Sequence, residues 1–310
     1  MSISCSKCNK PAVYLRRYTD ERLCKDCLRT TTIQRVRRVI NREKMLQEDD
    51  RIVVAISGGK DSAVLLHIMY QIEKDFSKTE LIPLTIDEGV HGYRNKALEA
   101  ARELTTILDL PLLVKTFQEH FGRSLDEIVQ LRTESSPGAC SYCGVLRRQA
   151  INSAALELEA DVVVTGHNLD DEAQTVMMNM LRGDSRRIAR TNRSRIHPIE
   201  GLVPRVKPIK EISERDIVAY THQFSLPYHD VPCPYEVEAY RNDIRSFLNE
   251  MEHKRPGTLL AVLRSSDAIS QAFEKTRENH HQIELCERCG TPSSSAICKA
   301  CSMLDDLEVR

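Results

Sequence analysis

The sequence lacks any long apolar run. It contains no stretch of about 18 consecutive apolar residues, which excludes the usual pattern of a membrane-spanning helix. The first residues, Met1 to Cys5, do not form the apolar core of a secretory signal peptide. These two absences predict a cytoplasmic protein that is not embedded in a membrane.

Net charge is almost absent as well. The 44 lysines and arginines balance 45 aspartates and glutamates, which leaves a formal charge of -1. Such a balance argues against a protein that binds nucleic acid through bulk positive charge, although local basic patches remain compatible with it. Hydrophobic residues make up 41% and charged residues 29% of the chain, which is typical of a globular protein with one good-sized core.

The most informative stretch predicts a strand, a glycine turn and a helix in succession. Residues 51–56 are mostly β-branched, as in a strand that is covered on both faces, and residues 62–70 show helical apolar spacing. Gly58 and Gly59 lie between them. The helix N-terminus presents free backbone N–H groups to an anion, and Lys60 adds positive charge. The stretch therefore predicts a phosphate-binding loop.

The Walker form of this loop is missing. The Walker motif requires G-x-x-x-x-G-K-[ST], but Val54 occupies the position of its first glycine and Asp61 follows Lys60. The run from Ser57 to Ser62, SGGKDS, instead resembles the PP-loop of ATP pyrophosphatases. That family splits ATP into AMP and pyrophosphate and adenylates a substrate, so the resemblance implies an ATP site.

Eight of the eleven cysteines form C-x-x-C pairs near the two ends of the chain. In a chain without an export signal, metal binding is favoured over disulfides. Four thiolates complete a tetrahedral zinc ion and leave no position for a substrate, so each group predicts a structural site. The first predicted zinc site comprises Cys5, Cys8, Cys24 and Cys27, and the second comprises Cys286, Cys289, Cys298 and Cys301.

The remaining cysteines, Cys140, Cys143 and Cys233, leave three interpretations open. Three thiolates can hold a [4Fe–4S] cluster and leave one iron open. A zinc site would need a fourth ligand, which His229 could provide. Cys140 and Cys143 could also form a redox pair without Cys233.

The rest of the pattern predicts βαβ units and hence a parallel sheet with right-handed crossovers. Because ligands bind at the carboxyl ends of such strands, the loops after Ile56, Ile86 and Thr165 should face one crevice. The further strands are expected at 80–86, 110–117 and 161–165, and the helices at 95–108, 125–131, 145–158, 213–224, 242–250 and 258–275.

Two basic segments could contact RNA. Residues 31–47 predict a helix with several arginines, and residues 182–195 contain six arginines and one acidic residue. A solvated helix face and a mobile loop are the simpler interpretations. Beside a nucleotide site, binding of a phosphate backbone is favoured for residues 182–195.

These motifs together resemble the tRNA 2-thiouridine synthetases of the PP-loop superfamily, which includes TtcA and TtuA. The resemblance covers essentially the whole chain and follows the family's order: SGGKDS, PGACSYCGVLRR around Cys140 and Cys143, TGHNLDD ending at Asp171, and the single Cys233. The segments IDEGVHGYR and YCGVLRRQ resemble the archaeal NcsA and eukaryotic cytosolic lineage, which modifies the wobble uridine. Arg147 favours this lineage, because TtuA-type enzymes, which modify the T-loop ribothymidine, typically have lysine there.

The resemblance implies an α/β fold with a parallel sheet, helices on both faces and a four-cysteine zinc module at each end. The expected domains are a zinc finger at 1–30, the catalytic PP-loop domain at 31–235, a helical region at 236–280 and a zinc ribbon at 281–310.

The resemblance also implies the roles of individual residues. Lys60, Asp61 and Asp171 are expected to be catalytic, and the two aspartates are candidates for Mg²⁺ or substrate contacts. Cys140, Cys143 and Cys233 are the implied ligands of a catalytic [4Fe–4S] cluster. ATP contacts are expected from Ala55, Ser57, Gly58, Gly59, Lys60, Asp61, Ser62, Ile86, Arg147 and Gly166.

The implied reaction adenylates the C2 oxygen of a tRNA uridine and then replaces it with sulfur. The donor would be a ubiquitin-like carrier with a C-terminal thiocarboxylate, or free sulfide, and a persulfide relay on the same cysteines is the alternative to the cluster. A homodimer is expected. The competing hypotheses are TtuA-type thiolation, a PP-loop tRNA-modifying ligase of non-sulfur chemistry and a non-enzymatic zinc RNA-binding protein.

Overall fold

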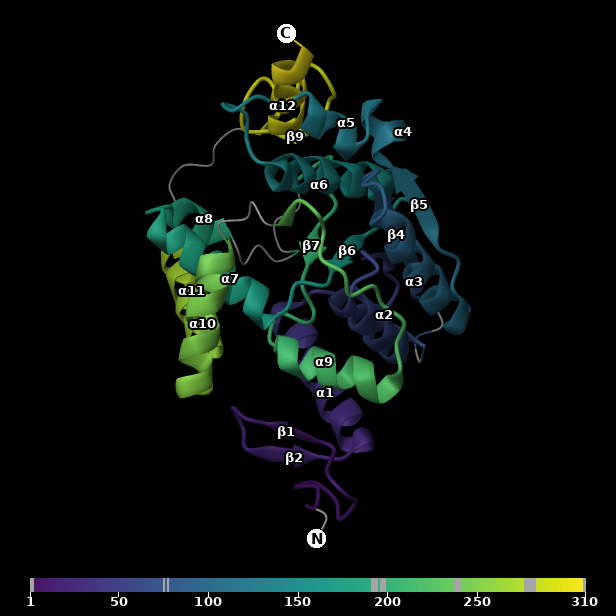
Figure 1. Cartoon of the computed structure of the whole chain (residues 1–310), viewed down its shortest axis with the longest axis vertical. Helices are drawn as coiled ribbons and strands as arrows, with labels where there is room; N and C mark the ends of the chain where they lie inside the picture. The colour runs from purple at the N-terminus through teal and green to yellow at the C-terminus, as the bar shows by residue number, and fades with distance from the viewer. Residues whose placement is uncertain are drawn as a thin grey trace.

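A five-stranded parallel sheet forms the centre of the protein (Figure 1). The structure is a computed structural model that describes residues 3–74, 76, 78–190, 195, 199–236, 241–275 and 283–308. The strand order is β5-β4-β3-β6-β7, and every neighbouring pair is parallel. The strands are β3 (Arg51–Ala55), β4 (Glu80–Asp87), β5 (Leu113–Thr116), β6 (Val162–Thr165) and β7 (Arg205–Val206).

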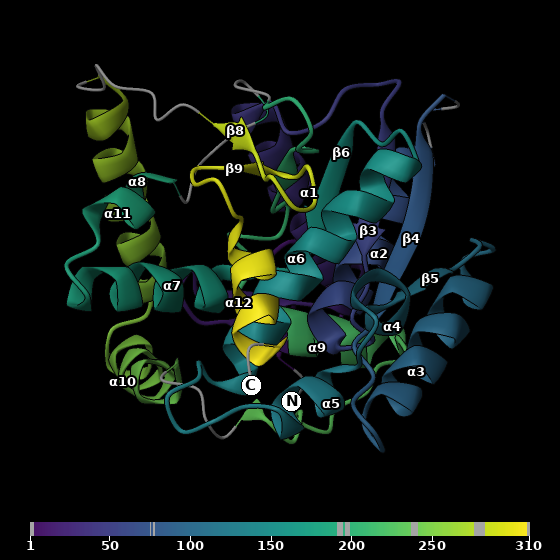
Figure 2. The ribbon, with the colours of Figure 1, turned by 90° about the horizontal axis from the view of Figure 1, so that it is seen from above.

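Helices cover both faces of the sheet, because alternate strand residues point in opposite directions. Ile52 and Val54 belong to one hydrophobic core, whereas Val53 belongs to a second core on the other face. Figure 2 shows the sheet between the two helical layers. The first core packs against α1 (Lys25–Glu43), α2 (Lys60–Glu73), α3 (Arg94–Ile107) and α9 (Glu214–Phe224). The second packs against α4 (Phe117–Phe121), α5 (Leu125–Gln130), α6 (Ala139–Glu157) and α12 (Lys299–Glu308).

Four helices form a separate layer beside the sheet, on the left in Figure 1. Leu169 and Ala173 pack there against Ile244, Leu248 and Leu263 in a third hydrophobic core. The helices of this layer are α7 (Leu169–Leu181), α8 (Ser185–Arg190), α10 (Arg241–Lys254) and α11 (Thr258–Lys275).

The two cysteine modules lie at opposite ends of the molecule (Figure 1). Near the N-terminus, the hairpin of β1 (Tyr14–Arg16) and β2 (Glu21–Leu23) precedes α1. Near the C-terminus, β8 (Glu284–Leu285) and β9 (Pro292–Ser293) pair antiparallel and precede α12. The predicted fold class is therefore confirmed: a parallel sheet with helices on both faces and a four-cysteine group at each end.

Several local predictions were wrong at element boundaries. Helix α1 begins at Lys25 rather than residue 31, because the Cys24 side chain caps it by accepting the N–H of Cys27. Helix α6 begins at Ala139 rather than residue 145, so Cys140 and Cys143 lie inside its first turns. The short strand β7 has no clear sequence signal and was not predicted.

The arginine-rich segment is only partly a loop. Residues 185–190 form α8, and Arg187 pairs with Asp184 (3.1 Å). Arg195 forms an ion pair with the buried Asp50. Residues 191–194 and the side chain of Arg186 lie outside the described part of the chain. The expected loop is therefore wrong for residues 185–190, whereas binding of a phosphate backbone by this segment stays a prediction.

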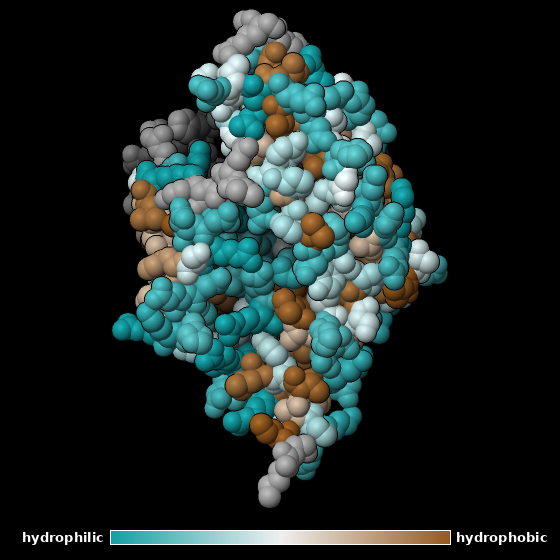
Figure 3. Space-filling view, viewed as in Figure 1, coloured by the Kyte–Doolittle hydropathy of each residue, from teal (hydrophilic) through white to brown (hydrophobic). Residues whose placement is uncertain are grey.

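The visible surface is mainly polar. Hydrophilic residues cover most of the face in Figure 3, and hydrophobic residues form scattered spots between them. Among the described residues, none of the helices has the length and apolar character that a bilayer crossing requires.

Candidate functional site

The glycine turn between β3 and α2 has a backbone that requires glycine at its first position. Gly58 has φ +86°, and a Cβ atom there would lie 2.1 Å from the carbonyl oxygen of Ala97. Gly59 caps α2 without a side-chain hydrogen bond. The first N–H groups of α2 therefore receive no cap from a side chain and can bind an anion.

Two serines brace this loop from inside. The Ser62 hydroxyl accepts the N–H of Ser57 (3.1 Å) and donates to the carbonyl of Gly59 (2.9 Å). Gly166 lies against the same turn, because a Cβ atom on it would be 3.1 Å from the Ser62 nitrogen. A side chain at residue 166 would push the helix start away from β6.

Charged groups converge beside the loop. Lys60 Nζ lies 2.8 Å from Glu214 Oε1 and 3.4 Å from Asp61 Oδ2. The Asn168 amide donates to Asp61 Oδ1 (2.7 Å). Burial raises the pKa of Asp61, although Lys60 and Asn168 act in the opposite direction. Although burial opposes it, the pKa of Lys60 is raised by its two carboxylate neighbours, so lysine remains the cation of the loop.

The start of α7 holds two more carboxylates near the loop. Asn168 caps this helix by accepting the N–H of Asp171 (2.9 Å). Asp171 Oδ1 lies 3.2 Å from Arg241 Nη1. Burial raises the pKa of Asp171, and it raises the pKa of Asp170 to about 6 even though the Glu214 N–H donates to Asp170. Asp61 and Asp171 therefore lie near each other, where they could bind a divalent cation.

The predicted backbone contacts lie at one edge of the sheet. Ala55 is the last residue of β3 and pairs with Thr165, the last residue of β6. Ile86 is the second-to-last residue of β4, and Gly166 follows β6 directly. This is the carboxyl edge, where parallel α/β sheets bind ligands.

A chain of polar contacts leads from the glycine turn to Cys143. Arg94 donates to the carbonyl of Ser57 (2.5 Å) and to Thr85, and its Nε lies 3.1 Å from Glu88. Glu88 Oε1 also forms an ion pair with Arg147 Nε (2.6 Å), and Arg147 Nη2 donates to Cys143 Sγ (3.0 Å). Glu88 thus joins two arginines, one at the loop and one at a cysteine.

The structure brings Cys140, Cys143 and Cys233 into one region. Cys140 donates to the carbonyl of Tyr235 (3.4 Å), two residues after Cys233. Burial raises the pKa of Cys143 to about 11, and Arg147 lowers it while Glu88 and Cys233 raise it. Burial likewise raises the pKa of Cys233. Binding of a metal centre would therefore release protons from these thiols.

The spacing of these thiols does not match a single zinc ion. Zinc thiolates at about 2.3 Å from the metal lie about 3.8 Å from one another. The four-cysteine groups have all their sulfur atoms within 4.8 Å, but among the described residues Cys140, Cys143 and Cys233 form no such group, either alone or with His229. A cubane cluster binds each thiolate at a different iron, so its ligands lie farther apart than those of a single zinc ion.

His229 instead supports the phosphate loop. Its backbone N–H donates to the carbonyl of Gly58 (2.8 Å), and its ring packs 5.3 Å from the ring of Tyr93. Its Nε2 atom is buried without a hydrogen-bond partner among the described residues. The zinc interpretation of the middle cysteines therefore stays an alternative prediction.

Both predicted four-cysteine groups assemble. Cys8 Sγ lies 3.6 Å from Cys24 Sγ, and Cys289 Sγ lies 3.7 Å from Cys298 Sγ. Although burial opposes the shift, N–H donors lower the pKa of Cys5 to about 6, and the N–H of Cys298 is the largest cause that lowers the pKa of Cys286 to about 6. Each group could hold a metal ion, and its sulfur spacing fits zinc.

Sequence reasoning gave no role to several residues of this site. Glu88 and Arg94 follow β4 within the IDEGVHGYR segment, and polar residues at a strand's carboxyl end were the available signal. Glu214 sits in the first turn of α9. Arg241 had no distinguishing sequence pattern.

Family models match nearly the whole chain. A model described as PP-loop domain matches residues 28–252. A model described as 2-thiouridine synthetase TtuA, N-terminal LIM domain, matches residues 4–29, and a zinc-ribbon model matches residues 284–309.

Individual proteins match over the same length. The tRNA 2-thiolation protein NcsA of Haloferax volcanii is 35% identical, and the alignment covers 99% of both chains. The cytoplasmic tRNA 2-thiolation protein 1 of Drosophila pseudoobscura pseudoobscura is 38% identical over 99% of this chain and 89% of the relative. A solved structure, the U34-tRNA thiolase NcsA from Methanococcus maripaludis with its [4Fe-4S] cluster, has a TM-score of 0.85 and 29% identity, and covers 99% of this chain and 97% of its own.

Proposed function

This chain belongs to the PP-loop tRNA 2-thiolation family that includes NcsA and cytoplasmic tRNA 2-thiolation protein 1, and from that premise we propose that it makes 2-thiouridine at the wobble position. As a member of this family, the protein is a tRNA sulfurtransferase. Its relative with the similar structure is described as a U34-tRNA thiolase, which supports the wobble position.

The phosphate loop carries the proposed adenylation step. The N–H groups of α2 and the Lys60 ammonium bind the phosphates of ATP, as free helix termini do. The C2 oxygen of the uridine attacks the α-phosphorus, and the bond to pyrophosphate breaks. Asp61 and Asp171 would hold Mg²⁺, which would neutralise negative charge on the phosphates. Positioning and neutralisation of charge supply most of this catalysis.

ATP contacts from the other predicted residues follow from their position. Ser57 and Ser62 shape the loop, while Gly58, Gly59 and Gly166 let the backbone approach the nucleotide. Backbone groups near Ala55 and Ile86 line the adenine side at the carboxyl edge of the sheet. Arg147, which Glu88 holds, is the proposed phosphate contact.

The middle cysteines carry the proposed sulfur step. Sulfide attacks C2 of the adenylated uridine, the C2–O bond breaks, and AMP leaves with its oxygen. Cys140, Cys143 and Cys233 are the proposed ligands of a [4Fe–4S] cluster, which would supply an iron position that holds sulfide. Arg147 donates to Cys143 and pairs with Glu88, so it connects the thiols with the residues near the phosphate loop.

The remaining components are proposals of the same kind. The terminal four-cysteine groups bind one Zn²⁺ each, which gives two per chain. A thiocarboxylated ubiquitin-like carrier or free sulfide supplies the sulfur. The protein acts as a homodimer in the cytoplasm, which agrees with the word cytoplasmic in the name of its relatives.

One observation carries the proposal: the contacts from Ser57 through Arg94, Glu88 and Arg147 to Cys143. They join the glycine turn to one of the thiols through a continuous set of polar contacts, which is buried at Arg94 and Glu88 and exposed at Arg147. Adenylation and sulfur insertion need such proximity, because both reactions act on the same uridine carbon–oxygen unit.

The test separates the two steps. We expect Asp61→Ala to lose both pyrophosphate release and thiolation with tRNA, ATP, Mg²⁺ and sulfide. Cys143→Ser should retain pyrophosphate release and lose thiolation. Mass spectrometry of nuclease digests then locates the sulfur.

Three results would contradict the proposal. Sulfur found in the T-loop would favour TtuA-type specificity. Full activity of Cys143→Ser would favour non-sulfur PP-loop chemistry. No pyrophosphate release from the wild type with any tRNA would favour a non-enzymatic RNA-binding protein.

A further inference from the structure

A second polar cavity lies away from the phosphate loop. It is enclosed by the N-terminal cysteine module, α1 and the beginning of α11, and its volume is about 800 Å³. Ligand pockets typically measure about 300–1,000 Å³, so this volume admits a group the size of a nucleotide. Its basic lining residues are Lys7, Arg16, Arg35, Arg38 and Arg264.

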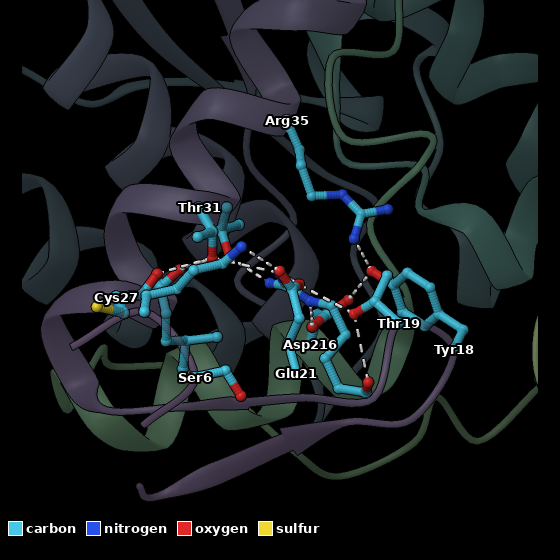
Figure 4. Close-up of polar contacts among 12 residues, drawn as sticks. Ser6, Tyr18, Thr19, Glu21, Cys27, Thr31, Arg35 and Asp216 are labelled. Atoms are coloured by element: carbon cyan, nitrogen blue, oxygen red, sulfur yellow. Dashed lines mark hydrogen bonds and ion pairs between the residues drawn. The ribbon is translucent and has the colours of Figure 1, made fainter. Parts of the chain in front are cut away.

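One wall of the cavity is a rigid hydrogen-bond network (Figure 4). Arg16 is 1% exposed, and its Nε donates to Asp216 (2.8 Å). Arg16 also donates to Thr31 (3.2 Å), and the Tyr18 hydroxyl donates to Asp216 (2.8 Å). This network fixes the β1–β2 hairpin against α1 and α9, so the wall is formed before any ligand binds.

The cavity's carboxylates are already paired. Glu21 lies 2.7 Å from Lys7 and 3.4 Å from Arg16. Glu211 lies 2.7 Å from Arg42, which is outside the cavity. These acids therefore cannot neutralise the other cations of the cavity without giving up their partners.

Three guanidinium groups remain without a carboxylate partner among the described residues. Arg35 contacts the Tyr18 hydroxyl and the carbonyl of Glu211 (3.5 Å), which are neutral groups. Arg38 and Arg264 are exposed, and no carboxylate of the described chain lies within 4.0 Å of either. The lining thus has uncompensated positive charge, although the whole chain has a net charge of -1.

We propose that this cavity binds backbone phosphates of the RNA substrate at a distance from the uridine that reacts. Guanidinium groups bind phosphate oxygens through two parallel hydrogen bonds. They are also more weakly hydrated than an ammonium group, so they lose less hydration when they bind a phosphodiester. Arg35 and Arg38 lie one helical turn apart on α1, which presents two such groups to one ligand. The inference rests on the proposed function, because it takes tRNA as the substrate.

The first turn of α9 connects this cavity with the nucleotide loop. Glu214 contacts Lys60 (2.8 Å), whereas Asp216 contacts Arg16 (2.8 Å). Residues two positions apart lie on nearly opposite sides of a helix. RNA bound in the cavity would therefore lie across α9 from Lys60 of the phosphate loop. The N-terminal cysteine module would then form part of the RNA site as well as a structural unit.

The test uses the full-length protein and measures the affinity for tRNA at several KCl concentrations. The variant is Arg38→Ala with Arg264→Ala, two exposed side chains whose loss should leave the fold intact. The matched control is Lys96→Ala with Arg102→Ala, two exposed residues of α3 outside the cavity that remove the same charge. Thermal unfolding and wild-type thiolation are recorded in parallel.

We expect the cavity variant to bind tRNA about tenfold or more weakly near 0.1 M salt, with a salt dependence reduced by about two phosphate contacts. The control should match the wild type. Equal binding and equal slopes in the two variants would overturn the inference. A cavity variant that binds tRNA normally but loses binding of a thiocarboxylated carrier would also overturn it, by assigning the cavity to a protein partner. Failure of the wild type to thiolate tRNA would instead refute the proposed function.

Discussion

Glu88→Gln tests the contact network that joins the phosphate loop to the middle cysteines. The substitution keeps the size of the side chain and removes its charge. The Glu88 side chain is 5% exposed and the Arg94 side chain 4% exposed. Without the Glu88 carboxylate, Arg94 would keep a buried charge whose other partners in the described part of the chain, Thr85 and the carbonyl of Ser57, are neutral. Breaking a buried ion pair in this way costs about 3–5 kcal/mol.

The magnitude separates a buried network from a surface contact. A loss of about 3 kcal/mol corresponds to a melting temperature lower by about 6 °C, at about 2 °C per kcal/mol for larger domains. Glu80→Gln is the matched control, because Glu80 also lies on β4 and pairs with Arg51 Nε at 2.7 Å, but its side chain is 53% exposed. Such surface pairs contribute about 0–1 kcal/mol.

The assay is differential scanning fluorimetry together with steady-state kinetics of pyrophosphate release. We expect Glu88→Gln to raise the KM for ATP, because Arg94 no longer holds the carbonyl of Ser57 in place, while Glu80→Gln leaves the KM unchanged. If both variants melt within about 1 °C of the wild type and share its KM, the buried network does not stabilise the loop and the reasoning fails.

Three further substitutions test other parts of the structure. Gly58→Ala should lower the melting temperature, because its Cβ atom would lie 2.1 Å from the Ala97 carbonyl, whereas Gly59→Ala meets only an ordinary 3.5 Å contact within the protein and should keep the melting temperature even though it weakens ATP binding; equal melting temperatures would contradict the proposed loop geometry. Cys24→Ser should lower the zinc content by one ion per chain by mass spectrometry and lower the melting temperature, and an unchanged zinc count would refute the first site. Burial lowers the pKa of His67 from 6.5 to about 4, with Arg29 and Lys74 as further causes. Between these two pH values the unfolded chain binds a proton that the native state does not bind. The free energy of unfolding therefore falls by about 1.4 kcal/mol for each pH unit of acidification in this range. Urea unfolding at pH 7 and pH 5 should show a smaller loss for His67→Gln, and an equal loss would contradict the burial of a neutral ring.

The parts of the site that depend on short stretches of sequence could be predicted. The motif SGGKDS after a β-branched run specifies the turn locally. Gly58 can adopt the positive φ that the turn has, and Gly59 has no side chain that could cap α2. The C-x-x-C pairs likewise place two ligands each by local geometry. The parallel sheet followed from alternating strands and helices, because such connections have few allowed topologies.

Other features could not be predicted because tertiary packing decides them. The helix start at Ala139 depends on Gly138 as the N-cap, whereas the cysteines and Ser141 that follow have weak helix propensity. The paired state of Arg195 depends on Asp50, which is distant in sequence but lies beside it in the fold. The run of like charges therefore did not show that part of it is paired within the chain and that residues 185–190 form a helix.

The same reasoning explains why the charge-balanced sequence can still serve a polyanionic substrate. Carboxylates at the nucleotide loop and near the N-terminal module are bound to specific buried or half-buried cations, such as Glu88 with Arg94 and Asp216 with Arg16. Acids held in this way contribute to the net charge but not to a free negative surface. The arginines that have no carboxylate partner among the described residues, including Arg38 and Arg264, then determine the local electrostatic potential that a phosphate meets. An estimate of RNA affinity from the net charge is therefore too low wherever acids are paired within the protein. The salt dependence of tRNA binding by the Arg38 and Arg264 double variant measures how much these two arginines contribute.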